Sequence, residues 1–394
     1  MSGNYSELAE YIESYWPNLR QENTLETKSA LGLPRPYYVP SIEVVDGFSF
    51  PHMYYWDSYF TVQGFWGTAR EPEIWGLAEN MFDLIRRFGF VPNSNSFSHL
   101  SRSQPPLLSS LVRQLDEKSN AGPEWLHLAY IRVREEYKTV WMGTIQPHKR
   151  QVYEGLSRYY DTNVLHVLAE AESGWDYTTR FEDQALRWLP VDLNALLYKY
   201  EMDLAWLAER LGREKSIQYW KGKADARKQT MNRLMWNDHE GMFFDYQWRD
   251  ARIGEVKSLA TYVPMFAGMC SDEQAARLVE NLSQFETDHG LTTTAKEYEP
   301  ADSKQWASPN GWAPLHDFVV DGLLNYGYED EAKRIAEKWV NTVNNRFQQT
   351  GKVYEKYNVV QLNEEAGGAV YPDQHGFGWT NGVTSKFITL ISSS

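Results

Sequence analysis

Apolar residues recur at helical spacing along most of this 394-residue chain. The clearest pattern predicts a helix from Asp192 that ends at Gly212, because apolar residues three and four positions apart share one helical face. Similar patterns predict helices over 54–67, 72–88, 107–115, 218–235, 271–282, 313–326 and 330–347. Alternation of apolar and polar residues is confined to 242–246 and 352–357, so only these stretches predict strands. The pattern favours an all-α fold of roughly a dozen helices.

The N-terminal region differs from the rest. Residues 8–15 form a short helical pattern that we expect Pro17 to stop. Residues 18–51 contain several prolines and glycines without sustained periodicity, which predicts an extended, non-helical segment. No linker rich in Gly, Ser or charge divides the helices, so residues 1–394 are expected to form one domain. Helices paired inner and outer around an axis would gather the polar loops at one end.

Charge and cysteine content exclude several functions. The formal net charge of -14 argues against nucleic acid or an anionic membrane as partner. One cysteine excludes an internal disulfide and fits a reducing compartment, and no secretory signal or long apolar run is present, which predicts a soluble, cytoplasmic protein. His52, His99, His316 and His375 lack the spacing of a helical ligand pair, so we expect neither a metal nor another cofactor. The sequence leaves the oligomeric state open, and a monomer is compatible with it.

Aromatic residues make up 15% of the chain, with Trp 16, Tyr 25 and Phe 17. Large rings bury much apolar surface, but Trp and Tyr also carry a polar group that needs a partner. Their abundance therefore suggests a polar, aromatic cleft as well as a core. Such a cleft is suited to a sugar, whose C–H faces pack on rings and whose hydroxyls accept and donate hydrogen bonds.

Two carboxylates are candidates for catalysis. Asp176 lies between Trp175 and Tyr177, and burial against rings would favour its protonated form, as a general acid requires. Alternatively, it is an ordinary loop aspartate paired with Arg180. Glu355 also lies in an aromatic stretch, and it is a candidate general base or else a structural partner of Lys356 or of a remote arginine. Hydrolysis of a glycosidic bond needs two such carboxylates.

Several aromatic and polar stretches supply candidate sugar-binding residues. Asp57, in the first turns of a predicted helix, either caps that helix or binds hydroxyls at a cleft rim. The polar loops 92–95 and 101–106 are either solvated or form a hydroxyl-binding wall. The candidate sugar-binding residues are Phe50, Tyr54, Trp56, Asp57, Asn93, Arg102, Gln104, Gly174 and Trp312.

The chain resembles the trehalase family of inverting glycoside hydrolases (glycoside hydrolase family 37) over nearly its whole length. The resemblance rests on seven stretches in the family's order: 54–60 (YYWDSYF), 102–106 (RSQPP), 173–176 (SGWD), 190–195 (PVDLNA), 309–314 (PNGWAP), 355–358 (EKYN) and 376–382 (GFGWTNG). It implies an (α/α)6 barrel with the cleft at one end. It also implies that Asp176 is the general acid and Glu355 the general base, with carboxyl groups roughly 6.5 to 9.5 Å apart. By the same matching, the positions that bind sugar are Trp56, Asp57, Asn93, Arg102, Gln104 and Gly174.

The chain also departs from the family pattern. Ser49 stands where the family has an arginine, Ala307 replaces an aspartate and Val370 replaces a glutamate. Residues 158–172 are shortened and lack an expected Arg-Pro-Glu stretch. Several of the missing charges are ones the family uses around the leaving sugar. We therefore expect an inverting hydrolase of an α-glucoside, with trehalose as the first candidate. The alternatives are an α-glucoside with a smaller or non-sugar aglycone, and a sugar-binding protein on the same scaffold.

Overall fold

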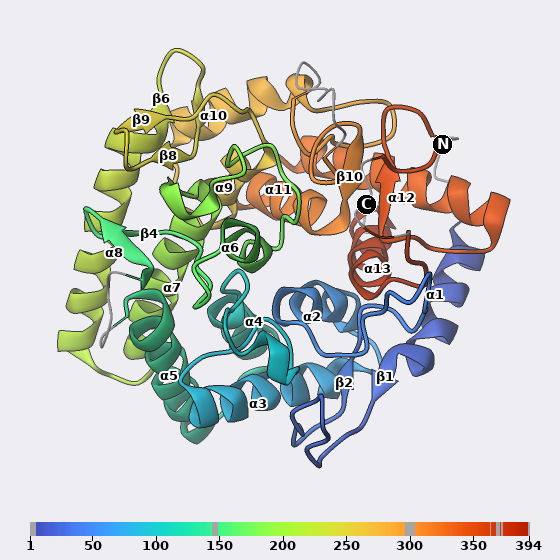
Figure 1. The fold of residues 1–394 in the computed structure, drawn as a ribbon, viewed down its shortest axis with the longest axis horizontal. Helices are drawn as coiled ribbons and strands as arrows, with labels where there is room; N and C mark the ends of the chain where they lie inside the picture. The colour runs from blue at the N-terminus through green and yellow to red at the C-terminus, as the bar shows by residue number, and fades with distance from the viewer. Residues whose placement is uncertain are drawn as a thin grey trace.

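The computed structural model describes residues 5–143, 149–295, 304–362, 364–367, 371 and 373–392. Helices in two concentric layers dominate this part of the chain (Figure 1). The inner layer consists of α2 (Tyr55–Val62), α4 (Leu108–Ser119), α7 (Val191–Arg210), α9 (Val263–Phe266), α11 (Ala313–Asn325) and α13 (Gly378–Ser392). Contacts link α4 to α7, α7 to α9, α9 to α11, α11 to α13 and α13 to α2. Gln114 of α4 donates a hydrogen bond to the Tyr59 hydroxyl of α2 (3.2 Å), which closes the ring.

The outer layer wraps this ring. It consists of α1 (Ser6–Leu19), α3 (Glu71–Phe88), α5 (Pro123–Glu136), α8 (Glu214–Met235), α10 (Asp272–Glu280) and α12 (Glu329–Thr350). Outer helices bury one stripe of residues; α12 buries Ile335, Trp339 and Val343, which lie three or four positions apart. Every residue of the inner helix α2 is buried. The pairing of inner and outer helices is that of an (α/α)6 barrel.

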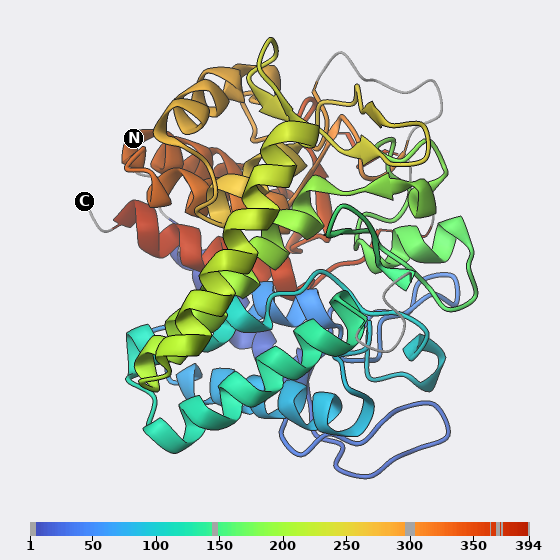
Figure 2. The same ribbon diagram turned by 90° about the vertical axis from the view of Figure 1, so that its left-hand side faces the viewer.

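The remaining elements gather at one end of the barrel. Figure 2 shows the long helix α8 across the near side, with α6 (His166–Glu172) and short strands toward the right, the end that faces the viewer in Figure 1. The strands pair antiparallel as β1 (Arg20–Gln21) with β2 (Tyr37–Tyr38), β3 (Gln151–Tyr153) with β4 (Leu156–Ser157), β6 (Trp236–Asn237) with β7 (Met242–Phe243), β10 (Asn310–Trp312) with β11 (Lys356–Asn358), and β8 (Tyr246–Gln247) between β5 (Trp188–Leu189) and β9 (Arg252–Ile253).

The periodicity located most of the long helices, but it did not predict α5 or α13. Short strands such as β1 and β3 also lie outside the two stretches predicted as strands. The prediction that Pro17 stops the first helix is wrong, because α1 continues through Pro17 to Leu19. Trp16 and Leu19 are buried on either side of the proline, so packing of the last turn overrides the local preference. From Arg20 to Tyr54 the chain contains no helix, as predicted for an extended segment, and it contributes only β1 and β2 to the named elements.

Candidate active site

A cavity of about 180 Å³ lies among the loops at the strand-bearing end of the barrel. Its walls are aromatic and polar. The lining residues that the sequence predicted are Phe50, Tyr54, Trp56, Asp57, Asn93, Arg102, Gln104, Gly174, Asp176 and Glu355. They come from segments far apart in the chain, which the fold brings together around one cavity. The volume is below the roughly 300 to 1,000 Å³ of pockets for larger ligands, so the cavity suits a ligand of about one sugar ring.

Asp57 and its neighbours enter the cavity at the start of α2. The side chain of Asp57 does not cap this helix, because α2 has no side-chain cap hydrogen bond and its N-cap residue is Tyr54. Asp57 is 6% exposed, and burial raises its pKa well above the ordinary value. Gln104 accepts a hydrogen bond from the Trp56 N–H (3.1 Å) and hydrogen-bonds to the Asp57 carboxylate. The polar edge of the cavity is therefore tied to the first turn of α2.

The floor of the cavity depends on a glycine. Gly174 has a φ of 73°, and a Cβ there would lie 2.5 Å from the Trp56 ring. The Trp56 ring in turn packs near Trp306 at 5.7 Å between centroids. Only glycine allows both the left-handed backbone and the close approach of this ring.

Asp176 lies two residues after this glycine. Its Oδ1 is buried without a hydrogen-bond partner among the described residues. The pKa of Asp176 is raised to about 7, chiefly by burial and in part by the negative charge of Glu170, while Arg102 opposes the shift. The alternative pairing with Arg180 is wrong, because that guanidinium binds Asp192 (2.6 Å) and Asp245 (2.8 Å). The Asp176 carboxyl group is therefore set to hold a proton near neutral pH.

Glu355 lies on another wall, between α12 and β11, with both carboxylate oxygens in contact with donors. Tyr371 donates its hydroxyl to Oε1 (2.8 Å), and the Lys356 ammonium lies 3.2 Å from Oε2. Lys356 also pairs with Asp373 at 2.7 Å. Burial raises the pKa of Glu355, while Lys356 and Tyr371 oppose this shift. Glu355 is thus a structural partner of Lys356, as one of the two predictions had it, and it also lines the cavity.

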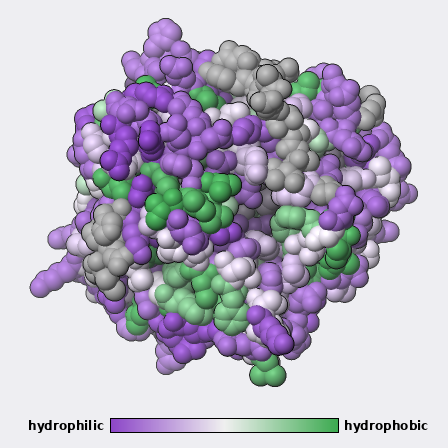
Figure 3. All heavy atoms as spheres, viewed as in Figure 1, coloured by the Kyte–Doolittle hydropathy of each residue, from purple (hydrophilic) through white to green (hydrophobic). Residues whose placement is uncertain are grey.

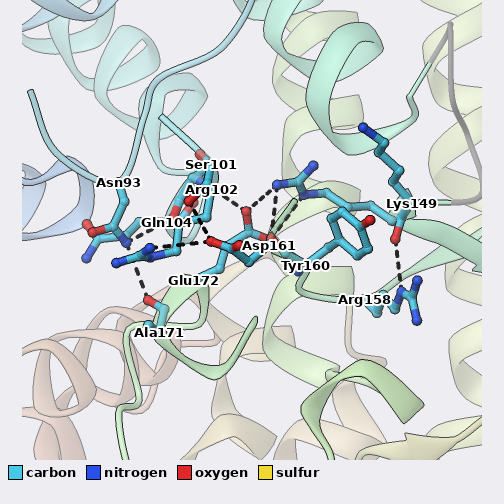
Figure 4. Close-up of polar contacts among 12 residues, drawn as sticks. Asn93, Ser101, Arg102, Gln104, Lys149, Arg158, Tyr160, Asp161, Ala171 and Glu172 are labelled. Carbon is cyan, nitrogen blue, oxygen red and sulfur yellow. Dashed lines mark hydrogen bonds and ion pairs between the residues drawn. The ribbon is translucent and has the colours of Figure 1, made fainter. Parts of the chain in front are cut away.

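The third wall is the loop from Ser101 to Gln104, which Figure 4 shows beside Asn93 and Glu172. Glu172 accepts hydrogen bonds from the backbone N–H groups of Ser103 (2.7 Å) and Tyr160 (2.7 Å) and pairs with Arg150. Arg102 contacts Asp161 at 3.4 Å, and its buried Nε has no hydrogen-bond partner among the described residues. The loop is therefore fixed from behind while donor groups of Arg102 remain for a ligand.

The family model named Trehalase matches residues 2–174 and 157–392. The chain belongs to the trehalase family. The enzyme is similar to neutral trehalase Nth1 from Saccharomyces cerevisiae, with 26% identity and a TM-score of 0.80 over 98% of this chain and 80% of that one. It also shares its fold with the GH63 mannosylglycerate hydrolase from Thermus thermophilus in complex with glucose, at 16% identity and a TM-score of 0.72 over 96% of this chain and 99% of that one. These matches identify a trehalase-like glycoside hydrolase with an (α/α)6 barrel.

One predicted sugar-binding residue of this trehalase-family enzyme lies outside the cavity. Trp312 is fully buried, stacks on Trp306 at 3.8 Å between centroids and donates its indole N–H to the Gln305 carbonyl (3.1 Å). Trp306 lines the cavity instead. Two tryptophans of one loop stack face to face, and only the front ring can meet a ligand.

Other lining residues were not predicted as site residues. They are Phe48, His99, Ala171, Trp306, Tyr371, Phe377 and Trp379. Phe377 and Trp379 lie in the stretch 376–382 that carries the family resemblance, so the sequence contained a signal for them. Tyr371 has no periodic or motif signal of its own.

Two of the residues that depart from the family pattern, Ser49 and Ala307, are next in sequence to residues of the cavity wall. Neither Ser49 nor the fully buried Ala307 is among the residues that line it. Val370 falls outside the described residues. Within 158–172, Arg158 donates to the Lys149 and Leu186 carbonyls instead of to the cavity (Figure 4).

The described residues were also compared with the requirements of a metal site and of a membrane-spanning helix. They contain no group of three or more His, Cys, Asp or Glu side chains that could hold a metal ion. No helix in this part of the enzyme is long and apolar enough to cross a membrane.

Proposed function

We propose that the enzyme hydrolyses the bond between glucose and its aglycone in an α-glucoside, with inversion at the anomeric carbon. The supporting observation is that Asp176 and Glu355, two of the three carboxylates that line the cavity, have different surroundings. Asp176 has a raised pKa and an oxygen without a partner among the described residues, whereas Glu355 contacts a cation and a hydroxyl donor.

In this mechanism Asp176 is the general acid. Its proton goes to the glycosidic oxygen as the bond from that oxygen to C1 breaks, and the aglycone leaves as an alcohol. Glu355 takes a proton from a water molecule on the opposite face of the sugar while the water oxygen bonds to C1. The product is β-glucose, and the acid and base regain their initial states by exchange of a proton with solvent.

We further propose that the other lining residues hold the glucosyl unit. The rings of Phe50, Tyr54 and Trp56 are suited to the C–H faces of the sugar, and Asp57, Asn93, Arg102 and Gln104 to its hydroxyls. The Gly174 backbone leaves room for the sugar beside the acid.

Trehalose is the first substrate to test, because the similar yeast protein is called a neutral trehalase. Glucose release should be measured with trehalose and other α-glucosides, and proton NMR should follow the anomer that appears first. We expect β-glucose from an alkyl α-glucoside, and equal amounts of α- and β-glucose from trehalose, whose leaving group is itself α-glucose. Initial release of α-glucose from an alkyl α-glucoside, or of α-glucose alone from trehalose, would contradict inversion, and release of no glucose from any α-glucoside would contradict the proposed activity.

We also propose that residues 1–394 act as one catalytic domain in the cytoplasm. A single, buried, free cysteine supports the reducing compartment. Limited proteolysis would test the domain, since a stable fragment that releases glucose by itself would contradict it. Fractionation of the source cells would test the location.

A further inference from the structure

Apolar side chains gather on the face that carries the cavity. Figure 3, viewed as in Figure 1, shows hydrophobic surface over the region of α6. Val164, Leu165 and Val167, at the start of α6, are 57%, 51% and 54% exposed, and they are called the α6 patch below. Exposed apolar groups that cluster in this way mark a surface that meets a ligand or a partner.

The patch continues into the cavity. Val167 and Ala171 are four residues apart on α6, so they share one face of the helix, and Ala171 lines the cavity. The segment after α6 folds back onto it, because the Thr178 N–H donates to Glu170 Oε1 (2.9 Å). Tyr177 lies on this returning segment, directly after Asp176, and is 43% exposed. Tyr177 is thus next in sequence to the proposed proton donor, and Ala171 brings the same face of α6 to the cavity wall.

The backbone of this surface is strained at both ends. Val164 has a φ of 56° and Tyr177 a φ of 62°, in the left-handed region that side chains with a Cβ rarely adopt. A β-branched valine there is unusual, and such strain collects at ligand-binding positions. The Asp161 carbonyl holds the strained turn by accepting the Val164 N–H (2.9 Å), and the Asp161 carboxylate also contacts Arg102 of the cavity. The turn and the sugar-binding wall therefore share one anchor.

Polar groups of the same stretch have partners within the protein. The Asn163 side chain donates to Asp161 (2.8 Å), and His166 Nδ1 accepts the Leu186 N–H (3.2 Å). A sugar in this place would need hydrogen bonds to its hydroxyls, whereas the surface offers mainly methyl groups and one phenol ring. Three partly exposed residues also fall short of the roughly 800 Å² per partner of a stable protein interface.

We propose that Val164, Leu165, Val167 and Tyr177 bind the leaving group, and that the preferred substrate is an α-glucoside with an apolar alkyl or aryl aglycone. This inference rests on the proposed function. It places glucose in the cavity and the aglycone against α6, where Asp176 protonates the oxygen between them. The same chemistry then releases glucose and a hydrophobic alcohol.

A series of alkyl α-glucosides tests the proposal, because methyl, butyl, hexyl and octyl aglycones leave as alcohols of similar acidity. We expect kcat/KM to rise with chain length by up to about fourfold per methylene, the ratio that corresponds to about 0.8 kcal/mol for a buried CH2. Val167→Ser and Leu165→Ser should reduce this rise. Leu25→Ser, at a 76% exposed leucine of the N-terminal segment, is the control and should keep it.

The outcomes separate the inference from the proposed function. If wild type hydrolyses trehalose or methyl α-glucoside but gains nothing from a longer chain, the aglycone proposal is wrong and the hydrolase proposal stands. If no α-glucoside is cleaved, the proposed function fails. The patch is then tested by calorimetric binding of the same series, where equal affinity for methyl and octyl glucosides would overturn it. Self-association that Val167→Ser abolishes would assign the patch to a second copy of the chain and overturn the proposal.

Discussion

The Asp176 wall and the Glu355 wall of the cavity carry the same functional group in different surroundings. Asp176 has a buried oxygen without a partner among the described residues. The negative charge of Glu170 adds to the effect of burial in raising the pKa of Asp176. Glu355 is more deeply buried, at 1% exposure, yet Lys356 and Tyr371 contact its two oxygens. Burial alone would make both groups weak acids. The difference indicates that donors in direct contact, and not the degree of burial, distinguish the proposed proton donor from the proposed proton acceptor.

Removal of either carboxylate gives the largest expected effect. Asp176→Asn and Glu355→Gln should each lower kcat by about 10² to 10⁴-fold, the usual contribution of a general acid or base. The two variants should differ with α-glucosyl fluoride, whose leaving fluoride needs no proton. Activity on this substrate should persist in Asp176→Asn and be lost in Glu355→Gln. Asp183→Asn, at an exposed aspartate, is the control.

An equal loss on glucosyl fluoride in both variants would contradict the division of roles. Retention of most of the trehalose or alkyl glucoside activity by Asp176→Asn would remove Asp176 from the mechanism.

Lys356→Met should have the next largest effect, because it changes the pKa of the proposed base, Glu355. Without the ammonium, the pKa of Glu355 rises, so the acidic limb of the kcat/KM profile moves to higher pH. A shift of about one to two pH units is expected, because a hydrogen bond to a charged group contributes about 1.5 to 3 kcal/mol and one pKa unit corresponds to about 1.4 kcal/mol.

Asp373→Asn should move the same limb to lower pH, since the charge of Asp373 raises the pKa of Glu355. Lys352→Met, at an exposed lysine nearby in sequence, should leave the limb in place. If the acidic limb moved in the same direction in Lys356→Met and Asp373→Asn, the two charges would affect activity through the stability of the fold and not through the pKa of Glu355.

Asp176→Asn should also stabilise the fold above neutral pH. The aspartate pKa rises from 3.8 to about 7 on folding, so the folded state holds an extra proton between these values and its stability falls as pH rises through them. An asparagine removes this penalty. Allowing for partial contact with solvent, the free energy of unfolding at pH 8 should increase by roughly 1 to 3 kcal/mol, with little change near pH 3. Urea unfolding at the two pH values measures this, and an equal change at both would contradict the raised pKa.

Tyr371→Phe should have the smallest effect. It removes one hydroxyl donor from Glu355 Oε1 and leaves the ring in place. A net loss of about 0.5 to 1.5 kcal/mol corresponds to a two- to tenfold lower kcat/KM, with a small upward shift of the acidic limb. Tyr219→Phe, on the outer helix α8, is the matched control. A loss as large as that of Glu355→Gln would assign Tyr371 a direct part in the reaction.

Sequence reasoning predicted the helical class and most of the cavity wall, for identifiable reasons. Amphipathic stripes such as that of α12 depend on local spacing, which the sequence contains directly. Asp57 and Gly174 lie in motifs whose unusual composition marked them. Trp312 was misplaced because spacing does not tell which of two stacked rings is in front.

The remaining features depend on contacts between distant segments. The ion pair of Arg180 with Asp245 joins residues 65 positions apart, and no local sequence pattern predicts it. The same holds for Tyr371, which meets Glu355 across 16 positions without a motif. The exposed surface around α6 was also not predicted, because a short apolar run reads equally well as core.

The contact between Gly174 and the Trp56 ring has a consequence for the history of the enzyme. Any larger residue at position 174 would have to displace the indole by more than its neighbours allow, since a Cβ would lie 2.5 Å from it. Single substitutions of Gly174 are therefore expected to be lost during evolution, and a new substrate specificity has to arise at other positions. The exposed side chain of Val164 meets no such obstacle, so a change there could alter the binding of the leaving group without displacing the Trp56 ring.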